Sequence, residues 1–357
     1  MRRGLISRSK AELPDAALDA RLERVRAAMA EAHLAALLVY TNNTRSAGVS
    51  WLTGFVPYWS EALLVVPRER EPVLVVALTY RVKSWIERTS RVADVIHTPR
   101  IGLEAARMIA ATEPAATIGL ADLDGLSVGI VDDLREGGPD LTLRDASALF
   151  ARLRAEADPA EIALAVTAAA IAQRTLERVS PQHASGCDTN LGEIIAAIER
   201  EARGLGAEEI YVAAAPDLAH DCRFKRIEGA ARPGGRFALR ATVAYKGTWI
   251  RLVRTFEDDG VATPNEEAAV RFAAAVAELP SERGFAGAAS WLVEGCRIVQ
   301  PLEPLLGSRV AEPITPAAGT LVSVQATIDV DGRPVLLGAP ALIGRRGEAA
   351  SLLVHLI

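Results

Sequence analysis

Apolar and polar positions alternate most clearly between residues 237 and 256, where they predict two strands joined by a turn. A period of two is typical of a strand with one buried face. Tyr245-Lys246-Gly247 predicts the turn between them, because glycine takes positive φ angles without steric cost. The pattern places Arg240 on one face of the first strand and Arg251 on one face of the second. Guanidinium groups in strands this apolar must contact water, a carboxylate or a bound anion.

The first 155 residues alternate between strand and helix patterns, which predicts an α/β layer with a mixed sheet flanked by helices. Apolar residues recur at helical spacing from Asp19 to His33, and 36–40 is a short buried strand followed by a polar stretch at 41–51. Further strands are expected at 61–66, 72–78, 92–97 and 117–122, and further helices at 80–88, 102–111 and 127–135.

The second half opens with a strong helix-start signal. Asp158 is a good N-cap, Pro159 suits the first helical position, and Glu161 completes a capping box. This helix should run to about residue 179. The pattern then predicts helices at 190–204 and from Thr263-Pro264-Asn265 to about 279, and strands at 207–215, 319–328 and 334–339.

Length and composition narrow the class of protein. The 357 residues suffice for two domains, and the 50% hydrophobic content provides material for a core. No apolar run approaches a membrane span, and the basic start lacks the apolar segment of a secretory signal. A net charge of −5 gives no electrostatic footprint for nucleic acid. The three cysteines, Cys187, Cys222 and Cys296, lie far apart in the sequence and suit a reducing compartment. Together these features lead us to expect a cytoplasmic protein without membrane or nucleic-acid partners.

The run from Gly247 to Phe256, with Arg-Thr-Phe at its end, resembles the metal-binding segment of the creatinase, prolidase and methionine aminopeptidase ("pita-bread") family. Metallopeptidases of that family carry an Asp in each strand, eleven positions apart, and these positions fall at Arg240 and Arg251. Divalent cations need donors with lone pairs, and arginine has none to give. The resemblance therefore implies the fold and argues against a metal in the same residues.

Other segments extend the resemblance over nearly the whole chain. A strand at 35–38 followed by Trp51-Leu52-Thr53-Gly54-Phe55 is similar to the family's amino-terminal domain, and 153–162 is similar to its domain boundary. The resemblance implies a creatinase-like N-terminal domain at 1–155, an α+β pita-bread domain at 156–357 and a homodimer. In the family, the N-terminal domain shapes the mouth of the active-site cleft. Residues in loops after strands are candidates to face this cleft: Asn42, Asn43, Arg45, Tyr58 and Trp59.

The remaining family ligands are also missing. No histidine occurs between His220 and His355, where the family has a ligand, and the two glutamate positions fall at Gln325 and about Gly338. The stretch 281–313 departs from the family, and its reactive side chains are Glu294, Cys296 and Arg297.

The loop at 216–223 corresponds to one that carries a substrate-facing histidine in the family. His220 is the candidate, but it lies 20 residues before Arg240, a few more than usual, so Arg223 could occupy the equivalent place. A solvated loop histidine without a role is the other interpretation.

Three functional readings follow. In the first, a metal-independent homologue binds an anionic small molecule or a peptide carboxylate through Arg240, Arg251, Arg254, Gln325 and Arg223. By analogy with creatinase, which lacks the Asp pair, His220 would then be the catalytic acid–base of a hydrolase.

In the second, an inactive scaffold pairs its arginines with carboxylates such as Asp217, Asp221, Glu294, Glu208 or Glu209. In the third, an Xaa-Pro metallopeptidase makes hydroxide on a cation that these residues do not visibly hold. We expect no metal and no cofactor. Paired arginines would favour the scaffold, and free guanidinium groups in an open pocket would favour anion binding.

Overall fold

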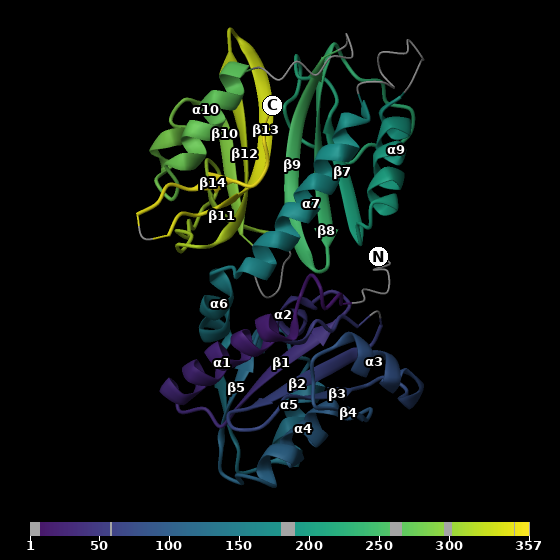
Figure 1. Cartoon of the computed structure of the whole chain (residues 1–357), viewed down its shortest axis with the longest axis vertical. Helices are drawn as coiled ribbons and strands as arrows, with labels where there is room; N and C mark the ends of the chain where they lie inside the picture. Colours follow the sequence, from purple (N-terminus) through teal and green to yellow (C-terminus); the bar gives the residue numbers. More distant parts are fainter. Residues whose placement is uncertain are drawn as a thin grey trace. The chain divides into compact units, whose positions relative to one another are not determined.

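The computed structural model describes residues 8–57, 59–179, 190–257, 266–295, 302–345 and 347–356. The chain divides into two compact units, one up to Arg154 and one from Ala155 onward. They are described separately, the first in the purple and blue part of the colour scale of Figure 1 and the second in its teal to yellow part.

The N-terminal unit is built on a six-stranded mixed sheet with the order β4-β3-β2-β1-β5-β6. The pairs β1–β2 and β2–β3 are antiparallel, and the pairs β1–β5, β3–β4 and β5–β6 are parallel. The strands are β1 Ala36–Asn42, β2 Glu61–Pro67, β3 Val73–Val76, β4 Asp94–His97, β5 Thr117–Ala121 and β6 Thr142–Asp145. The helices are α1 Asp15–Glu31, α2 Ala47–Thr53, α3 Lys83–Thr89, α4 Ile101–Ala110, α5 Val128–Gly137 and α6 Ser147–Ala155, with single turns η1 Tyr80–Val82 and η2 Leu123–Gly125.

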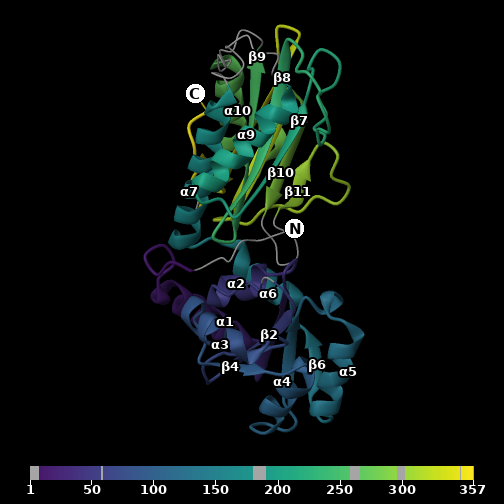
Figure 2. The same cartoon turned by 90° about the vertical axis from the view of Figure 1, so that its right-hand side faces the viewer.

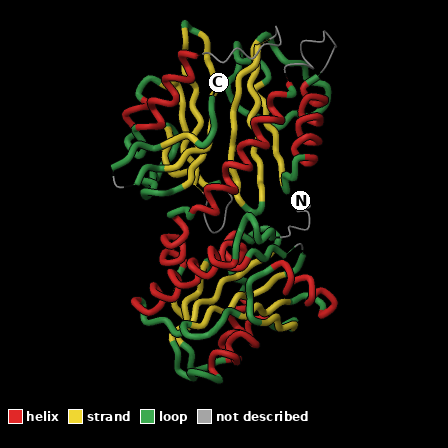
Figure 3. Tube along the Cα trace, viewed as in Figure 1, coloured by secondary structure: helices red, strands yellow, loops and turns green. Residues whose placement is uncertain are grey.

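Helices cover both faces of this sheet (Figure 3). Successive strand residues point to opposite faces, and along β1 they enter two different cores: Leu37 and Val39 pack with α1, α2, α3 and α6, whereas Ala36 and Leu38 pack with α4 and α5. The predicted α/β layer with a mixed sheet is confirmed.

The sequence gives no sign of the helix α2, whose residues fall in and just after the stretch interpreted as polar. Its residues include Gly48 and Val49, which are weak helix formers. Trp51 supplies the stabilisation instead: it is 4% exposed and packs edge-on against Phe150, with ring centroids 5.8 Å apart. The helix ends at Gly54, whose φ of +76° suits glycine.

The C-terminal unit is an antiparallel sheet of eight strands in the order β11-β10-β12-β13-β9-β8-β7, with β14 paired to β13. Figure 2 shows α7, α9 and α10 gathered on one side of it, and their apolar residues share one core with the strands. The strands are β7 Glu209–Ala215, β8 Arg236–Tyr245, β9 Thr248–Glu257, β10 Ala288–Gly295, β11 Glu303–Gly307, β12 Leu321–Val330, β13 Arg333–Leu342 and β14 Ser351–Leu352. The helices are α7 Pro159–Glu177, α9 Leu191–Gly204 and α10 Glu266–Ala277, with a single turn η3 Glu282–Phe285.

The start of α7 is as the sequence predicts. The Asp158 side chain accepts a hydrogen bond from the Glu161 backbone at 3.0 Å, and the Glu161 side chain accepts one from the Asp158 backbone at 3.3 Å. This reciprocal capping box satisfies two backbone donors that have no partner within the helix. The cap predicted at 263–265 lies outside the described residues. Within the described part, no helix is long and apolar enough to cross a membrane.

Two tight turns set the register of the C-terminal sheet. Lys246-Gly247 joins β8 to β9 and Asp331-Gly332 joins β12 to β13, with φ angles of 48°, 81°, 52° and 74° in that order. Positive φ at both central residues defines the type I′ turn, whose twist matches that of paired strands.

The alternation predicted for the β8–β9 hairpin is confirmed. Leu239, Ala241 and Val243 enter the core under the helices, whereas Ala238 and Val253 belong to a separate small cluster on the opposite face of the sheet. Arg240 is in phase with Ala238, so it lies on this second face.

Candidate active site

Three of the positions compared with metal ligands lie in one row across the sheet. Gln325 on β12 pairs with Gly338 on β13, which in turn pairs with Val253 on β9. Val253 pairs with Arg240 on β8. Directly paired residues have Cβ atoms about 5 Å apart, so the fold brings together positions that are distant in sequence.

Arg251 is neutralised by Glu294, which β10 supplies from the stretch that departs from the family pattern. Nη1 of Arg251 donates to both carboxylate oxygens of Glu294, at 2.5 and 2.6 Å, and its Nε donates to Thr242 Oγ1 at 3.1 Å. The Glu294 side chain is 4% exposed and that of Arg251 is 22% exposed. A carboxylate this deeply buried needs a charged partner. Arg251 therefore has a structural role beside the site, where it neutralises the charge of Glu294.

Gln325 is held by the same carboxylate. Its Nε2 donates to Glu294 Oε2 at 2.9 Å, and the residue is 9% exposed. Because an ionised carboxylate only accepts hydrogen bonds, this contact fixes which end of the amide faces Glu294. The carbonyl oxygen of Gln325 is left as an acceptor on the other side.

Arg240 has a different environment from Arg251. Among the described residues its guanidinium group makes no hydrogen bond or ion pair, and its contact is with the face of Phe224, 4.8 Å from the ring centroid. Burial and, to a smaller extent, the charge of Arg251 together lower the pKa of Arg240 to about 10, and the charge of Glu294 partly opposes this shift. The group still carries its proton at neutral pH. Arg240 is thus a desolvated cation without a carboxylate partner in the described part of the chain.

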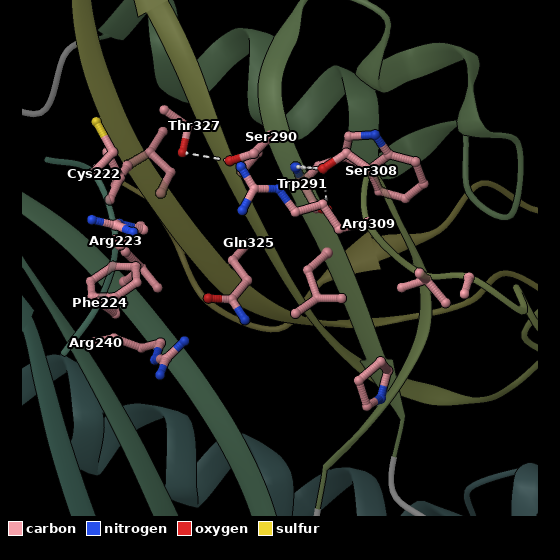
Figure 4. A pocket seen from close by; sticks show the side chains of 18 residues that line it. Cys222, Arg223, Phe224, Arg240, Ser290, Trp291, Ser308, Arg309, Gln325 and Thr327 are labelled. Carbon is pink, nitrogen blue, oxygen red and sulfur yellow. Dashed lines mark hydrogen bonds between the residues drawn. The ribbon is translucent and has the colours of Figure 1, made fainter. Parts of the chain in front are cut away.

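Arg240 faces a cavity of about 640 Å³ within the C-terminal unit. Figure 4 shows Arg240, Gln325 and Arg309 directed into it from different strands and loops. Cavities of this size hold small organic ligands. The lining residues are Cys222, Arg223, Phe224, Arg240, Val253, Ser290, Trp291, Leu292, Pro304, Ser308, Arg309, Val310, Ala311, Gln325, Ala326, Thr327, Leu336 and Leu337.

The loop before β8 places its two candidates differently. Arg223 lines the cavity but is exposed, and it forms an ion pair with Asp221, with Nε and Oδ1 3.0 Å apart. His220 is not among the lining residues: its side chain is 82% exposed, and Nδ1 lies 2.7 Å from Asp217 Oδ2. Of these two, Arg223 is the residue that the cavity contains.

Arg254 lies away from the cavity. Its guanidinium group donates to the backbone carbonyls of Val253, Gly338 and His355, at 2.9, 3.2 and 3.2 Å. Burial lowers the pKa of Arg254 to about 10, partly offset by the charge of Glu177 on α7. These contacts tie β9 to β13 and to the C-terminal segment.

Gly338 leaves no room for a ligand side chain. A Cβ at this position would lie 2.7 Å from Val253 Cγ2 and 3.0 Å from the Val324 carbonyl oxygen. Val253 thus fills the space that a glutamate at position 338 would need.

A comparison with known proteins identifies the N-terminal unit. Residues 21–155 match the family model of the creatinase/prolidase N-terminal domain. The N-terminal unit therefore carries a domain of this type. No significant match was found among curated proteins.

The fold resembles solved structures over both units. It is similar to the X-Pro aminopeptidase of Thermotoga maritima (TM-score 0.68, 15% identity, 93% of this chain and 97% of that one). It is also similar to the prolidase of Pyrococcus furiosus (0.67, 15%, 93% and 98%) and to the dipeptidase PepE of Mycobacterium ulcerans (0.66, 17%, 95% and 97%). At these identities the likeness concerns the fold.

The described residues at the positions compared with metal ligands do not form a donor set that fits a divalent cation. The described residues contain no group of three or more His, Cys, Asp or Glu that could hold a metal ion. The positions compared with carboxylate ligands carry two guanidinium groups, one amide and a glycine enclosed by Val253. A guanidinium group offers no lone pair to a metal and repels it.

Part of the cavity was not predicted from the sequence. Thr327 lies two residues beyond Gln325 on β12 and so shares its face, which strand alternation could have indicated. Phe224, Ser290 and Arg309 come from a loop, from β10 and from the segment after β11, and no motif marks them.

Candidates in the N-terminal unit are described within that unit alone. The Asn42 side-chain oxygen Oδ1 accepts hydrogen bonds from the backbone N–H groups of Thr44 and Arg45, at 2.9 and 2.8 Å. Arg45 forms an ion pair with Asp122 at 2.7 Å. Asn43 is exposed and Trp59 is 47% exposed. Tyr58, Cys187, Cys296 and Arg297 lie outside the described residues.

Proposed function

We propose that this protein, a pita-bread-fold relative of the creatinase/prolidase type, binds a small carboxylate, such as the carboxylate of a peptide, in the cavity in front of Arg240 and without a metal ion. The observation that carries the proposal is the state of Arg240: a desolvated guanidinium group that faces a 640 Å³ cavity and has no carboxylate partner among the described residues. A bound carboxylate supplies two parallel hydrogen bonds and the missing charge.

The lining supports binding more than acid–base chemistry. Among the described residues that line the cavity there is no His, Asp, Glu, Lys or Tyr. Burial raises the pKa of the Cys222 thiol, as does the charge of Asp221. The thiol is therefore a poor nucleophile at neutral pH. General acid–base work needs a group within hydrogen-bond reach of the ligand, and the exposed His220 is outside the lining.

The Arg251–Glu294 pair supports a second candidate, an inactive scaffold stabilised by a guanidinium group in place of a cation. Each candidate function rests on a different arginine: Arg251 has a carboxylate partner, whereas Arg240 has none in the described part. They differ in what happens when Arg240 is removed. We also propose a homodimer, on the family resemblance alone, and sedimentation equilibrium would test it.

Arg240→Leu tests the proposed function with two readouts. We expect carboxylate affinity to fall at least about thirtyfold, roughly 2 kcal/mol, because a charge-assisted contact is lost. We also expect the free energy of unfolding to rise by about 0.5–2 kcal/mol, because an unpaired desolvated charge is replaced by an apolar group beside Phe224 and Val253. Calorimetry with a panel of small carboxylates and phosphates, and urea denaturation, measure the two effects.

The matched control is Arg271→Gln. Arg271 lies on α10, outside the cavity, where it contacts Glu267 and the Asp329 carbonyl, so carboxylate binding should not change. A wild-type protein that binds no carboxylate would overturn the proposal. So would an Arg240→Leu variant that loses stability and binds as before, since Arg240 would then be structural.

A further inference from the structure

A second guanidinium group reaches the same cavity. Arg309 follows β11 and is exposed, and within the described part of the chain it makes no hydrogen bond or ion pair. Figure 4 shows it extending into the cavity toward Ser290 and Thr327, while Arg240 points in from beside Phe224. In this view the Gln325 side chain lies between the two guanidinium groups.

The end of the cavity near Arg309 also offers a hydroxyl proton. Ser290 and Thr327 are register partners on β10 and β12, and Ser290 Oγ donates to Thr327 Oγ1 at 3.0 Å. Two hydroxyl groups carry two protons, and their mutual bond uses one of them whichever way it points. The other has no acceptor among the described residues. A ligand oxygen can accept this proton together with one from Arg309.

The space between the two cationic ends is mostly apolar. Trp291, Leu292, Val253 and Leu336 line it, and Gln325 contributes an acceptor oxygen, since its amide nitrogen is held by Glu294. No carboxylate of the described residues lines the cavity to balance Arg240 and Arg309. Two uncompensated positive charges at separate ends match a ligand with two negative groups better than a ligand with one.

We infer that the ligand is a dianion, a molecule whose two carboxylates are separated by a short apolar segment. Arg240 binds one carboxylate, and Arg309 with the Ser290–Thr327 pair binds the other. This inference rests on the proposed function and adds to it the class of ligand and the residue that selects it.

The test compares dicarboxylates with monocarboxylates of the same chain length. Calorimetry would use glutarate, adipate and suberate beside pentanoate, hexanoate and octanoate, since the series scans the separation of the two charges. We expect the best dicarboxylate to bind wild-type protein at least about tenfold more tightly than its monocarboxylate. Arg309→Gln should remove this difference and leave monocarboxylate affinity unchanged, whereas Arg240→Leu should weaken both.

The outcomes separate the two proposals. Equal affinity for both series in wild-type protein would overturn the dianion inference and leave the proposed function standing. An Arg309→Gln variant that loses affinity equally for both series would also overturn it, since Arg309 would then act only through its overall charge. Absence of binding in either series would overturn the proposed function and this inference together. Because Arg309 is exposed, its replacement should leave the fold intact, and Arg271→Gln again serves as the control.

Discussion

Replacing Arg251 with alanine should lower the free energy of unfolding by about 3–5 kcal/mol, the usual cost of leaving one member of a buried ion pair alone. Among the described residues, Glu294 would keep a single hydrogen bond, from Gln325 Nε2, with its side chain 4% exposed. Thr242 Oγ1 would lose its guanidinium donor as well. Urea denaturation of the variant and the wild-type protein measures the difference.

Further variants of this pair, compared as in a double-mutant cycle, test whether the lost ion pair causes the destabilisation. Glu294→Gln should cost less than Arg251→Ala, because the Arg251 side chain is 22% exposed and can reach water. Arg251→Met combined with Glu294→Leu should recover most of the loss, since buried ion pairs are often replaced by apolar pairs without penalty. A loss below about 1 kcal/mol for Arg251→Ala would show that Glu294 is not held in the charged, buried state described here.

Gly338→Glu introduces the residue type that serves as a metal ligand at this position in the family. It should lower the free energy of unfolding by more than about 3 kcal/mol. Overpacking alone typically costs about 1–3 kcal/mol, and the new Cβ would lie 2.7 Å from Val253 Cγ2. The added carboxylate must also be desolvated within the sheet. The measurement is again urea denaturation, together with the manganese content of the purified variant, which should equal that of the wild type.

Two further variants separate the steric effect from the charge. Gly338→Ala should lose about 1–3 kcal/mol, and Val253→Ala in the same chain should recover part of that loss, because Val253 Cγ2 is the nearest obstacle. If Gly338→Glu is as stable as the wild-type protein, or gains a bound manganese ion, Val253 does not exclude a ligand side chain from position 338.

Much of the fold could be predicted because its strongest signals are local. The β8–β9 hairpin shows period-two alternation around a turn with glycine, and α7 starts with a complete capping box. The α2 helix could not be predicted, since burial of Trp51 against Phe150 rather than helix propensity stabilises it. The β6 strand was missed because its residues are mostly exposed and show no alternation.

The site was predictable only in the segments that the family resemblance covers. Of the residues predicted to bind substrate, Arg223, Arg240 and Gln325 line the cavity. The partner of Arg251 was one of several carboxylates considered, and only the pairing of β10 with β12 selects Glu294. Arg309 and the Ser290–Thr327 pair depend on how segments distant in sequence meet, which no single-segment pattern contains.

The lengths of the two type I′ turns determine which side chains face this cavity. Lys246-Gly247 lies about 20 Å along the strand from Arg240, at about 3.4 Å per residue. One inserted residue there would slip β9 by one position against β8 and move Val253 and Arg251 to the opposite side of the sheet. An insertion at Asp331-Gly332 would do the same between Gln325 and Gly338. We therefore expect a change of loop length alone to alter the selectivity of the proposed site, with every lining residue left in the sequence.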